Sequence, residues 1–494
     1  MLKEWTIRPL AMPALAITTS PRGLRVLVPG SDFRGEKRPL PHRFGPGVVT
    51  RARDGLWPDA LIVLACALGL RVVFAALLAD TYDPDEFVVL ALSRAVAHGA
   101  VPYRDFTFFH PPGILMLFRA LQPIVSWWWP SARLLTLAVD TGTALMVWQI
   151  GRRLYGSRTG LAAGLIYSAC PVALLSAVRV GQDPLITSLG VGGLLLLISG
   201  RSGTRTVLAG VCLGLAVMIK YPALLFLPLY LLAAPRRAMI AASTALVVVA
   251  CGFFPLFHYV PAVYAQTVTW QLLHRAPTDP WHRIAVVVAF WLLLNPLSLI
   301  GALRQRHPSW ALAGFAFGGL FVMTSQSYYH YFVPILPFAA LLAASTVTVA
   351  FEKAPRFVIA LALGTLALWG VALHAGPETF GLSPAHFSTV RHAVRVLDRS
   401  TSPGQRVVTD QFEYAYLARR PLAVDYFWNM RNTVRAETLE RSLTKAQAVV
   451  VTWGVAPTYP AGFPDYLRDK GYRRVRAGSA TVWLIPDHHS RAGG

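Results

Sequence analysis

Long runs of apolar residues dominate the chain from about residue 57 to residue 375. Each run approaches the roughly 20 residues that an α-helix needs to cross a bilayer, so the pattern predicts an all-α membrane domain of about eleven spans. A polar stretch over 80–110 follows the first run. The next apolar segment, 111–129, is bounded by Pro and Trp residues, which favours a helix at the membrane interface, with a short true span as the alternative.

Two of the apolar runs, 205–219 and 221–234, are too short for full crossings. Both outer flanks carry arginine, which indicates that the chain goes out and returns between them. We therefore expect two tilted or partial helices that meet at Lys220. A lysine between apolar helices is costly in a membrane, so Lys220 is a candidate functional residue.

The pattern changes after residue 375, where short runs rich in β-branched residues alternate with helix-like stretches. Interleaved strand and helix patterns of this kind predict a small α/β domain over 376–494. The N-terminal residues 1–56 are rich in Pro, Gly and Arg and contain no long apolar run. They are predicted to form a disordered tail without a cleavable signal peptide.

The composition is that of a membrane protein, with 54% hydrophobic residues, 14% charged residues and a mean hydropathy of +0.48. The net charge of +22 could indicate a nucleic-acid partner. The basic residues of 57–375, however, lie mostly in short connectors, which mark the cytoplasmic side of a membrane protein, and no nucleic-acid motif accompanies them. This distribution places the N-terminus in the cytoplasm and the C-terminal α/β domain outside.

Acidic residues are few in the predicted membrane domain, and they cluster. Only ten lie within it, and five of these fall in the first external loop, 80–110. The tetrapeptide from Asp83 to Glu86 places three carboxylates within four residues. Close carboxylates raise one another's pKa, so Asp85 or Asp83 can act as the base that deprotonates an acceptor hydroxyl. The alternative is structural, with one of these two aspartates capping the helix predicted over 87–98.

The rest of the loop favours a formed site. Gly99 ends the predicted helix, and a turn containing Tyr103 and Asp105 follows it. His110 stands directly before two prolines, where a site residue and a surface or packing residue are equally good interpretations.

Several motifs in order along the chain resemble those of a known superfamily. They are DPDE at 83–86, GxxPYRD at 99–105, HPPG at 110–113, RRLYG at 152–156, RVGQD at 179–183, MIKYP at 218–222 and YYHYFVPILP at 328–337. The set resembles the GT-C membrane glycosyltransferases, and most closely the bacterial relatives of dolichyl-phosphate-mannose–protein mannosyltransferase and of the lipid A aminoarabinose transferase. The resemblance covers about residues 57–374.

The resemblance implies a GT-C-type catalytic domain that uses a sugar donor carried on a polyprenyl phosphate at the outer face of the cytoplasmic membrane. An acid of the first loop would be the base, and transfer would invert the anomeric centre. The family's Asp-Glu pair falls on Asp85 and Glu86, so Asp85 is the first choice of base and Glu86 is a further catalytic candidate. Pro84 stands between two aspartates, a departure that keeps Asp83 in reserve. The family's mid-chain acid matches Asp183, a candidate for binding sugar hydroxyls or acceptor.

The leaving polyprenyl phosphate develops negative charge, which cationic groups near the membrane surface stabilise. The candidate phosphate-binding residues are Lys220, Arg179 and Arg275. Interfacial anchoring is an equally good role for Arg275, which lies on the segment 258–283. The resemblance adds Tyr103, Asp105, His110, Asp183 and His330 as candidate substrate-binding residues.

The sequence contains no evident His/Asp ligand set for a metal, and the family members it resembles often work without one, so a divalent metal ion stays open. The donor sugar, hexosyl or pentosyl, and the acceptor, a glycan, protein or lipid of the cell envelope, also stay open. A lipid or glycolipid transporter or flippase is the alternative function, although its spans should carry more charge than these. A lipid-binding scaffold is the third, and the intact acidic loop argues against it.

Overall fold

The computed structural model describes most of the chain from residue 56 onward and two short pieces before it. The described residues are 17–18, 25–26, 56–270, 280–291, 295–304, 329–375, 385–423, 443–444, 446–452, 463–478 and 480–485. The chain divides into two units, Met1–Arg53 and Asp54–Gly494. In the first unit, strands β1 (Ile17–Thr18) and β2 (Arg25–Val26) pair antiparallel. Most of the predicted disordered tail lies outside the described residues.

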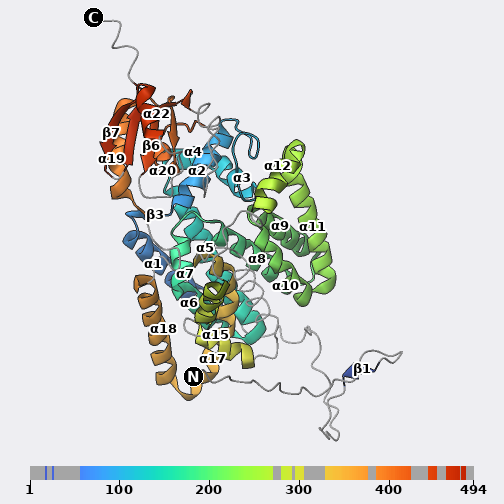
Figure 1. Cartoon of the computed structure of the whole chain (residues 1–494). Helices are drawn as coiled ribbons and strands as arrows, with labels where there is room; N and C mark the ends of the chain where they lie inside the picture. The colour runs from blue at the N-terminus through green and yellow to red at the C-terminus, as the bar shows by residue number, and fades with distance from the viewer. Residues whose placement is uncertain are drawn as a thin grey trace, which may run out of the picture. The chain divides into compact units, whose positions relative to one another are not determined.

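The second unit is mainly helical up to residue 375 (Figure 1). Its helices are α1 (Leu56–Leu77), α2 (Pro84–Ala97), α3 (Gly113–Ala120), α4 (Gln122–Trp127), α5 (Ser131–Tyr155), α6 (Ser157–Ala169), α7 (Pro171–Ala177), α8 (Gln182–Ile198), α9 (Gly203–Ile219), η1 (Tyr221–Leu225), α10 (Phe226–Ala233), α11 (Pro235–Phe253), η2 (Phe254–Tyr259), α12 (Val260–Tyr264), η3 (Ala265–Thr269), α14 (Pro280–Ala289), α15 (Pro296–Arg304), η5 (Tyr329–Ile335), α17 (Leu336–Lys353) and α18 (Pro355–Ala375). Proline opens several of them, including α7, α11 and α18, because the first helical position needs no N–H donor.

Helices long and apolar enough to cross a membrane are present in the described part of the chain, which makes this a multi-pass membrane protein. Four pass that test by length and composition: Trp57–Leu77, Ser131–Tyr155, Pro235–Thr269 and His330–Lys353. The pair α6 and α7, bent by 61° at the break between them, makes a fifth if it is counted as one span. Three shorter apolar helices follow the pair, over 182–233. The count of about eleven spans therefore stays a prediction.

The helix break predicted at Lys220 is present. Helix α9 ends at Ile219, Lys220 adopts an extended backbone with φ −158° and ψ 126°, and η1 begins at Tyr221. Pro222 in the first turn of η1 cannot donate a helical N–H, so the sequence itself favours a new start here. The segment 111–129, predicted to be one interfacial helix, is instead two short helices, α3 and α4.

Small residues let the helices of this unit approach closely. A Cβ on Gly160 would come within 2.5 Å of the Arg152 backbone nitrogen on α5, and one on Gly210 within 2.4 Å of the Ala241 carbonyl on α11. Such positions accept only glycine, the usual device for tight helix packing in membranes. The helix pairs α5–α6, α8–α9 and α9–α11 accordingly pack along their lengths.

A buried ion pair joins the first helices. The Arg71 side chain of α1 donates to the Asp140 carboxylate of α5, which also accepts from the Tyr167 hydroxyl of α6 at 2.6 Å. Arg71 and Asp140 are both fully buried. An isolated charge at this depth is expensive, so each residue makes the burial of the other tolerable. The sequence contained both residues but offered no way to pair them.

The C-terminal part contains a sheet, drawn in orange and red in Figure 1. It has four strands in the order β5-β6-β8-β7. Its strands are β5 (Arg406–Thr409), β6 (Ala446–Thr452), β7 (Arg473–Ala477) and β8 (Ala480–Leu484), and its helices are α19 (Phe387–Ser400), α20 (Phe412–Leu417) and α22 (Phe463–Asp469). Strands β5 and β6 are parallel, whereas β8 pairs antiparallel with both of its neighbours. A separate antiparallel pair joins β3 (Thr81–Tyr82) to β4 (Ala385–His386). The domain boundary predicted at residue 375 and the external side of this part stay predictions.

Candidate active site

The acidic tetrapeptide lies at the start of helix α2, and its aspartates have different local roles. Asp83 is the N-cap, and its Oδ1 accepts a hydrogen bond from the Asp85 backbone N–H at 3.0 Å. In return, Glu86 Oε1 accepts from the Asp83 N–H at 2.9 Å, which completes a capping box. Pro84 takes the first helical position. Capping therefore belongs to Asp83, and the helix begins at Pro84 rather than at residue 87.

Glu86 is an anchor at the centre of this region. Its side chain is fully buried, and its two oxygens accept from Arg133 Nε at 2.8 Å, Arg133 Nη2 at 2.7 Å and the Val180 N–H at 2.9 Å, in addition to Asp83 N–H. Arg133 Nη2 also donates to the Thr81 carbonyl at 2.8 Å. The carboxylate thus ties the start of α2 to α5 and to the chain before α8. Its lone pairs are occupied by protein donors.

Asp85 has the opposite character. Its side chain is exposed, and among the described residues its carboxylate makes no hydrogen bond or ion pair. The surrounding protein nevertheless displaces much of the bulk water, and this desolvation, followed by the charge of Asp83, raises the pKa of Asp85 to about 7. Lys220 opposes the rise, whereas Asp183 and Glu86 add to it. An accessible carboxyl with a pKa near neutrality suits a general base.

Asp83 is intermediate between Glu86 and Asp85 in how far protein partners occupy its carboxylate oxygens. Burial is the largest cause that raises the pKa of Asp83, and the nearby Arg179 guanidinium is the largest cause that lowers it. Arg179 Nη1 lies 3.7 Å from Asp83 Oδ2, and the arginine is 5% exposed. The net shift of the Asp83 pKa is upward. One oxygen of Asp83 is committed to the cap and the other faces a cation.

Asp183, Lys220 and His330 come together from three separate segments. Asp183 stands in the first turn of α8, Lys220 at the break between α9 and η1, and His330 in η5. Lys220 Nζ donates to both oxygens of Asp183 at 2.8 Å, and His330 Nε2 lies 3.9 Å from Asp183 Oδ2. The Lys220 ammonium also lies 4.6 Å from the centre of the Tyr331 ring. The chain that leads into Asp183 contacts the acidic tetrapeptide, because the Val180 N–H donates to Glu86 Oε2 at 2.9 Å. The charges of Lys220 and Asp183 act on the pKa of Asp85.

The second half of the loop is held by contacts of its own. Tyr103 adopts φ +65°, and its hydroxyl donates to the His110 carbonyl at 2.6 Å. Asp105 pairs with Arg104 at 2.7 Å, and its other oxygen also accepts from the Val101 N–H at 2.7 Å. The hydrogen bond from Arg104 lowers the pKa of Asp105. These hydrogen bonds hold the second half of the loop together from within, between residues 101 and 110.

Two residues that sequence reasoning missed help to build the loop. Arg133 is the ion-pair partner of Glu86. The sequence feature that could have identified it is its place, as a charged residue, at the start of a predicted membrane span. Gln266, in η3, donates to the Tyr103 carbonyl and accepts from the Phe108 N–H, both at 3.1 Å. Its signal was the only amide side chain in the sequence 235–269. Arg275, by contrast, lies outside the described residues.

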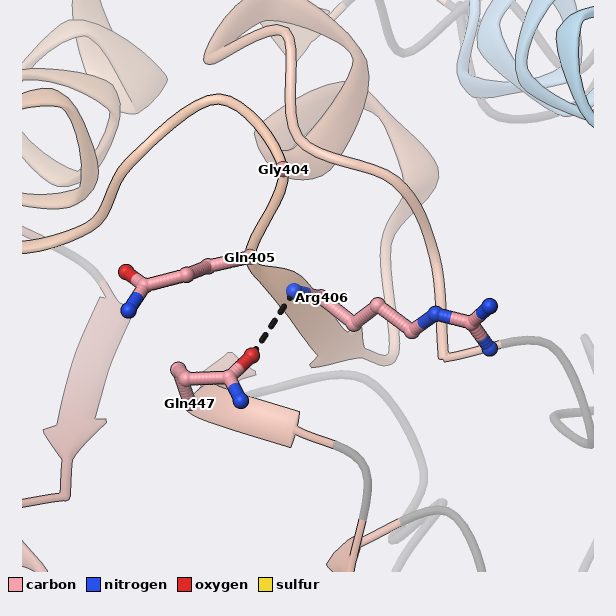
Figure 2. A pocket seen from close by; sticks show the side chains of 4 residues that line it. All are labelled: Gly404, Gln405, Arg406 and Gln447. Carbon is pink, nitrogen blue, oxygen red and sulfur yellow. Dashed lines mark hydrogen bonds between the residues drawn. The ribbon is translucent and has the colours of Figure 1, made fainter.

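Elsewhere in the described chain, a shallow pocket of about 460 Å³ lies at the start of β5 and β6. Its lining residues are Gly404, Gln405, Arg406 and Gln447, and the Arg406 N–H donates to Gln447 Oε1 at 2.9 Å (Figure 2). None of the site residues predicted from the sequence lines it. Within the described ranges, no group of three or more His, Cys, Asp or Glu side chains is placed to hold a metal ion.

Comparison with known proteins gives a family match over part of the chain and a fold. A family model described as dolichyl-phosphate-mannose-protein mannosyltransferase matches residues 109–261. No curated protein matches the chain. The crystal structure of ArnT from Cupriavidus metallidurans in the apo state superposes with a TM-score of 0.60 at 14% sequence identity, covering 86% of this chain and 98% of that one. The crystal structure of the same protein bound to undecaprenyl phosphate superposes with a TM-score of 0.60 at 14% sequence identity. It covers 87% of this chain and 97% of that one.

The structural likeness extends over nearly the whole of ArnT, although the low identity means that it shows the fold alone. The family match covers 109–261, which includes α3 to α11, Asp183 and Lys220 but not the acidic tetrapeptide. The resemblance predicted from the sequence motifs is therefore confirmed: this chain has the fold of the GT-C membrane glycosyltransferases and resembles the protein mannosyltransferases and ArnT.

Proposed function

We propose that the protein is an integral-membrane glycosyltransferase. It moves a sugar from a polyprenyl-phosphate donor to an acceptor hydroxyl at the outer face of the cytoplasmic membrane, with inversion of the anomeric centre. The observation that carries this proposal is the contact between the acidic loop and the segment 179–183. The loop presents Asp85, an accessible carboxylate with a pKa of about 7, and Asp183 of the segment holds the buried cation Lys220. The ArnT structure with undecaprenyl phosphate supports the choice of donor lipid.

Asp85 is the base. It takes the proton of the acceptor hydroxyl, whose oxygen then forms a bond to the anomeric carbon on the face opposite the phosphate. The bond between that carbon and the phosphate oxygen breaks, and its electron pair leaves with the polyprenyl phosphate. Asp83 stays in reserve because its oxygens serve the cap and face Arg179. Glu86, first ranked with these two, is assigned here to anchoring, since protein donors occupy its oxygens.

The leaving phosphate requires positive charge near the membrane surface. An ammonium group has three N–H donors, and Lys220 uses two of them on Asp183, so one remains for a phosphate oxygen. Arg179 and, by its place in the sequence, Arg275 are the further phosphate candidates. Asp183 holds Lys220 in place and, with His330, contacts the sugar or acceptor. Tyr103, Asp105 and His110 shape the loop around them.

The test is an assay for release of polyprenyl phosphate. Purified protein in lipid nanodiscs receives undecaprenyl-phosphate hexoses and pentoses with a short-chain alcohol as a general acceptor. We expect release with at least one donor, and a loss of about 10³-fold in kcat for Asp85→Asn, the scale of general base catalysis. Glu352→Gln, which alters an exposed acid paired with Arg158, is the matched control and should retain full activity.

Two results would overturn the proposal. Release that persists at the wild-type rate in Asp85→Asn would remove the assigned base. Movement of an intact lipid-linked sugar across a vesicle membrane, without release of phosphate from any donor, would instead establish the flippase alternative. The acceptor class, glycan, protein or lipid, follows from which envelope fraction receives the label.

A further inference from the structure

The C-terminal part contacts the acidic loop directly. Strand β3, which ends one residue before Asp83, pairs antiparallel with β4, so that Tyr82 lies opposite Ala385. The Phe387 N–H also donates to the Asp80 carbonyl at 2.9 Å. The backbone that leads into the acidic tetrapeptide is therefore held on one side by residues more than 300 positions further along the chain.

A buried hydrogen bond lies at the centre of this contact. The Tyr82 hydroxyl donates to Glu413 Oε1 at 2.9 Å, and the two residues are 2% and 3% exposed. Glu413 is in the first turn of α20, a helix that packs against α2. The Tyr82 ring is fixed in turn by Phe387, at 4.9 Å between ring centres, and by Phe87, at 5.3 Å.

Stability alone does not account for a glutamate here. A buried carboxyl group costs free energy unless all its polar atoms are bonded, and Glu413 Oε2 has no hydrogen-bond partner among the described residues. An apolar side chain of similar volume would pack between α2 and α20 at lower cost. What Glu413 provides is a hydrogen-bond acceptor for the Tyr82 hydroxyl, and this bond fixes the orientation of Tyr82.

The position of Tyr82 matters because the next residue is the N-cap. The dihedral angles of Asp83 place its carboxylate on the Asp85 N–H, and the first turn of α2 then directs the Asp85 side chain. A shift of the Tyr82 ring is transmitted through one peptide bond to the residue that presents both aspartates. Misplacement of a reacting group by about 1 Å costs as much as about 10²-fold in rate.

We propose that Glu413 is a positioning residue, which through its hydrogen bond to Tyr82 holds the Asp83–Asp85 segment in the geometry required for proton abstraction. This role rests on the proposed function, because it takes Asp85 of the positioned segment to be the base. It assigns to the C-terminal part a share in the reaction of the membrane domain, although Glu413 itself touches no reacting atom.

The experiment compares four variants in nanodiscs. Tyr82→Phe removes the donor, Glu413→Leu removes the acceptor and the charge, and Glu413→Gln keeps an acceptor oxygen. Tyr472→Phe is the matched control, because it removes a buried hydroxyl of the same C-terminal part that lies near the Leu443 and Ala446 carbonyls and not near the loop. The measurements are kcat and KM for release of polyprenyl phosphate, thermal unfolding, and hydrogen exchange of the amides of residues 80–90.

We expect Tyr82→Phe and Glu413→Leu to lower kcat about tenfold while KM for the donor stays within about twofold, since positioning the base affects the chemical step rather than donor binding. Amides at 80–90 should exchange faster in both. Glu413→Gln should recover most of kcat, and Tyr472→Phe should leave kcat and exchange at 80–90 unchanged.

An unchanged kcat in folded Glu413→Leu overturns the proposal, and so does an equal loss of kcat in Glu413→Gln and Tyr472→Phe, which would indicate general destabilisation. If the wild-type protein releases no polyprenyl phosphate from any donor, the proposed function fails by itself. Hydrogen exchange then still tests whether Glu413 holds the loop. Unchanged protection of the amides of residues 80–90 in Tyr82→Phe and Glu413→Leu would show that it does not.

Discussion

Lys220 and Asp183 form a buried ion pair in which the ammonium group lies 2.8 Å from each carboxylate oxygen. The two residues are 7% and 4% exposed. Either charge alone would carry a desolvation penalty of several kcal/mol, so the pair explains how a lysine can stand between two apolar helices. In the proposed function, Lys220 would meet the leaving phosphate as part of this pair, with its ammonium group already oriented by Asp183.

The first prediction separates the structural role of this pair from its role with phosphate. Lys220→Met leaves Asp183 buried and unpaired, which should lower the free energy of unfolding by about 3–5 kcal/mol and abolish measurable release of polyprenyl phosphate. The double variant Lys220→Met/Asp183→Asn should regain most of the thermal stability and none of the activity. Recovery of activity together with stability would show that the lysine has no role beyond packing.

The second prediction concerns pH. Desolvation by the surrounding protein and the charges of neighbouring acids raise the pKa of Asp85 to about 7, so the residue is protonated below that value and cannot accept a proton. The value of kcat/KM should therefore fall about tenfold per pH unit below pH 7 and level off above it. Initial rates between pH 5 and pH 9 measure this profile. A rate that stays constant down to pH 5 would mean that an acid with an ordinary pKa, or no acid, is the base.

The third prediction concerns Glu86, for which the expectation is loss of stability. Glu86→Gln replaces a carboxylate that accepts from Arg133 and from two backbone N–H groups, and it leaves the largely buried Arg133 without a counter-charge. We expect a loss of about 3 kcal/mol in the free energy of unfolding, measured as a lower Tm. Glu352→Gln breaks an exposed pair and should change Tm little. Equal Tm values for the two variants would contradict the anchoring role.

The fourth prediction links Glu413 to stability. Burial raises the pKa of Glu413 to about 7 from its ordinary 4.5, so the folded protein binds more protons than the unfolded chain between these values. The contribution of Glu413 to stability is therefore fully present below about pH 4.5 and is lost as pH rises towards 7. The Tm of Glu413→Gln should fall less steeply than that of wild type over this interval. Parallel curves for the two proteins would show that Glu413 does not titrate there.

Some features could be predicted from the sequence because they depend on neighbours within one helical turn. The break at Lys220 follows from the length of two apolar runs and from Pro222. The aspartate cap of α2 could be predicted because an acid stands just before a proline and an apolar helix. Which aspartate is the cap, Asp83 or Asp85, could not be predicted from the sequence. The apolar runs likewise predicted a multi-pass protein, and the ordered motifs predicted the GT-C resemblance.

The site itself required the tertiary structure. Glu86 meets Arg133 and the Val180 N–H, which are 47 and 94 residues away, and Tyr82 meets Glu413 at a separation of 331. No periodicity encodes such pairs, because they depend on which helices become neighbours. The sequence therefore determined that carboxylates gather in one loop and that a lysine interrupts a helix. Only the packing of the helices decided which carboxylate is bonded to structural partners, which one stays accessible, and which acid pairs with the lysine.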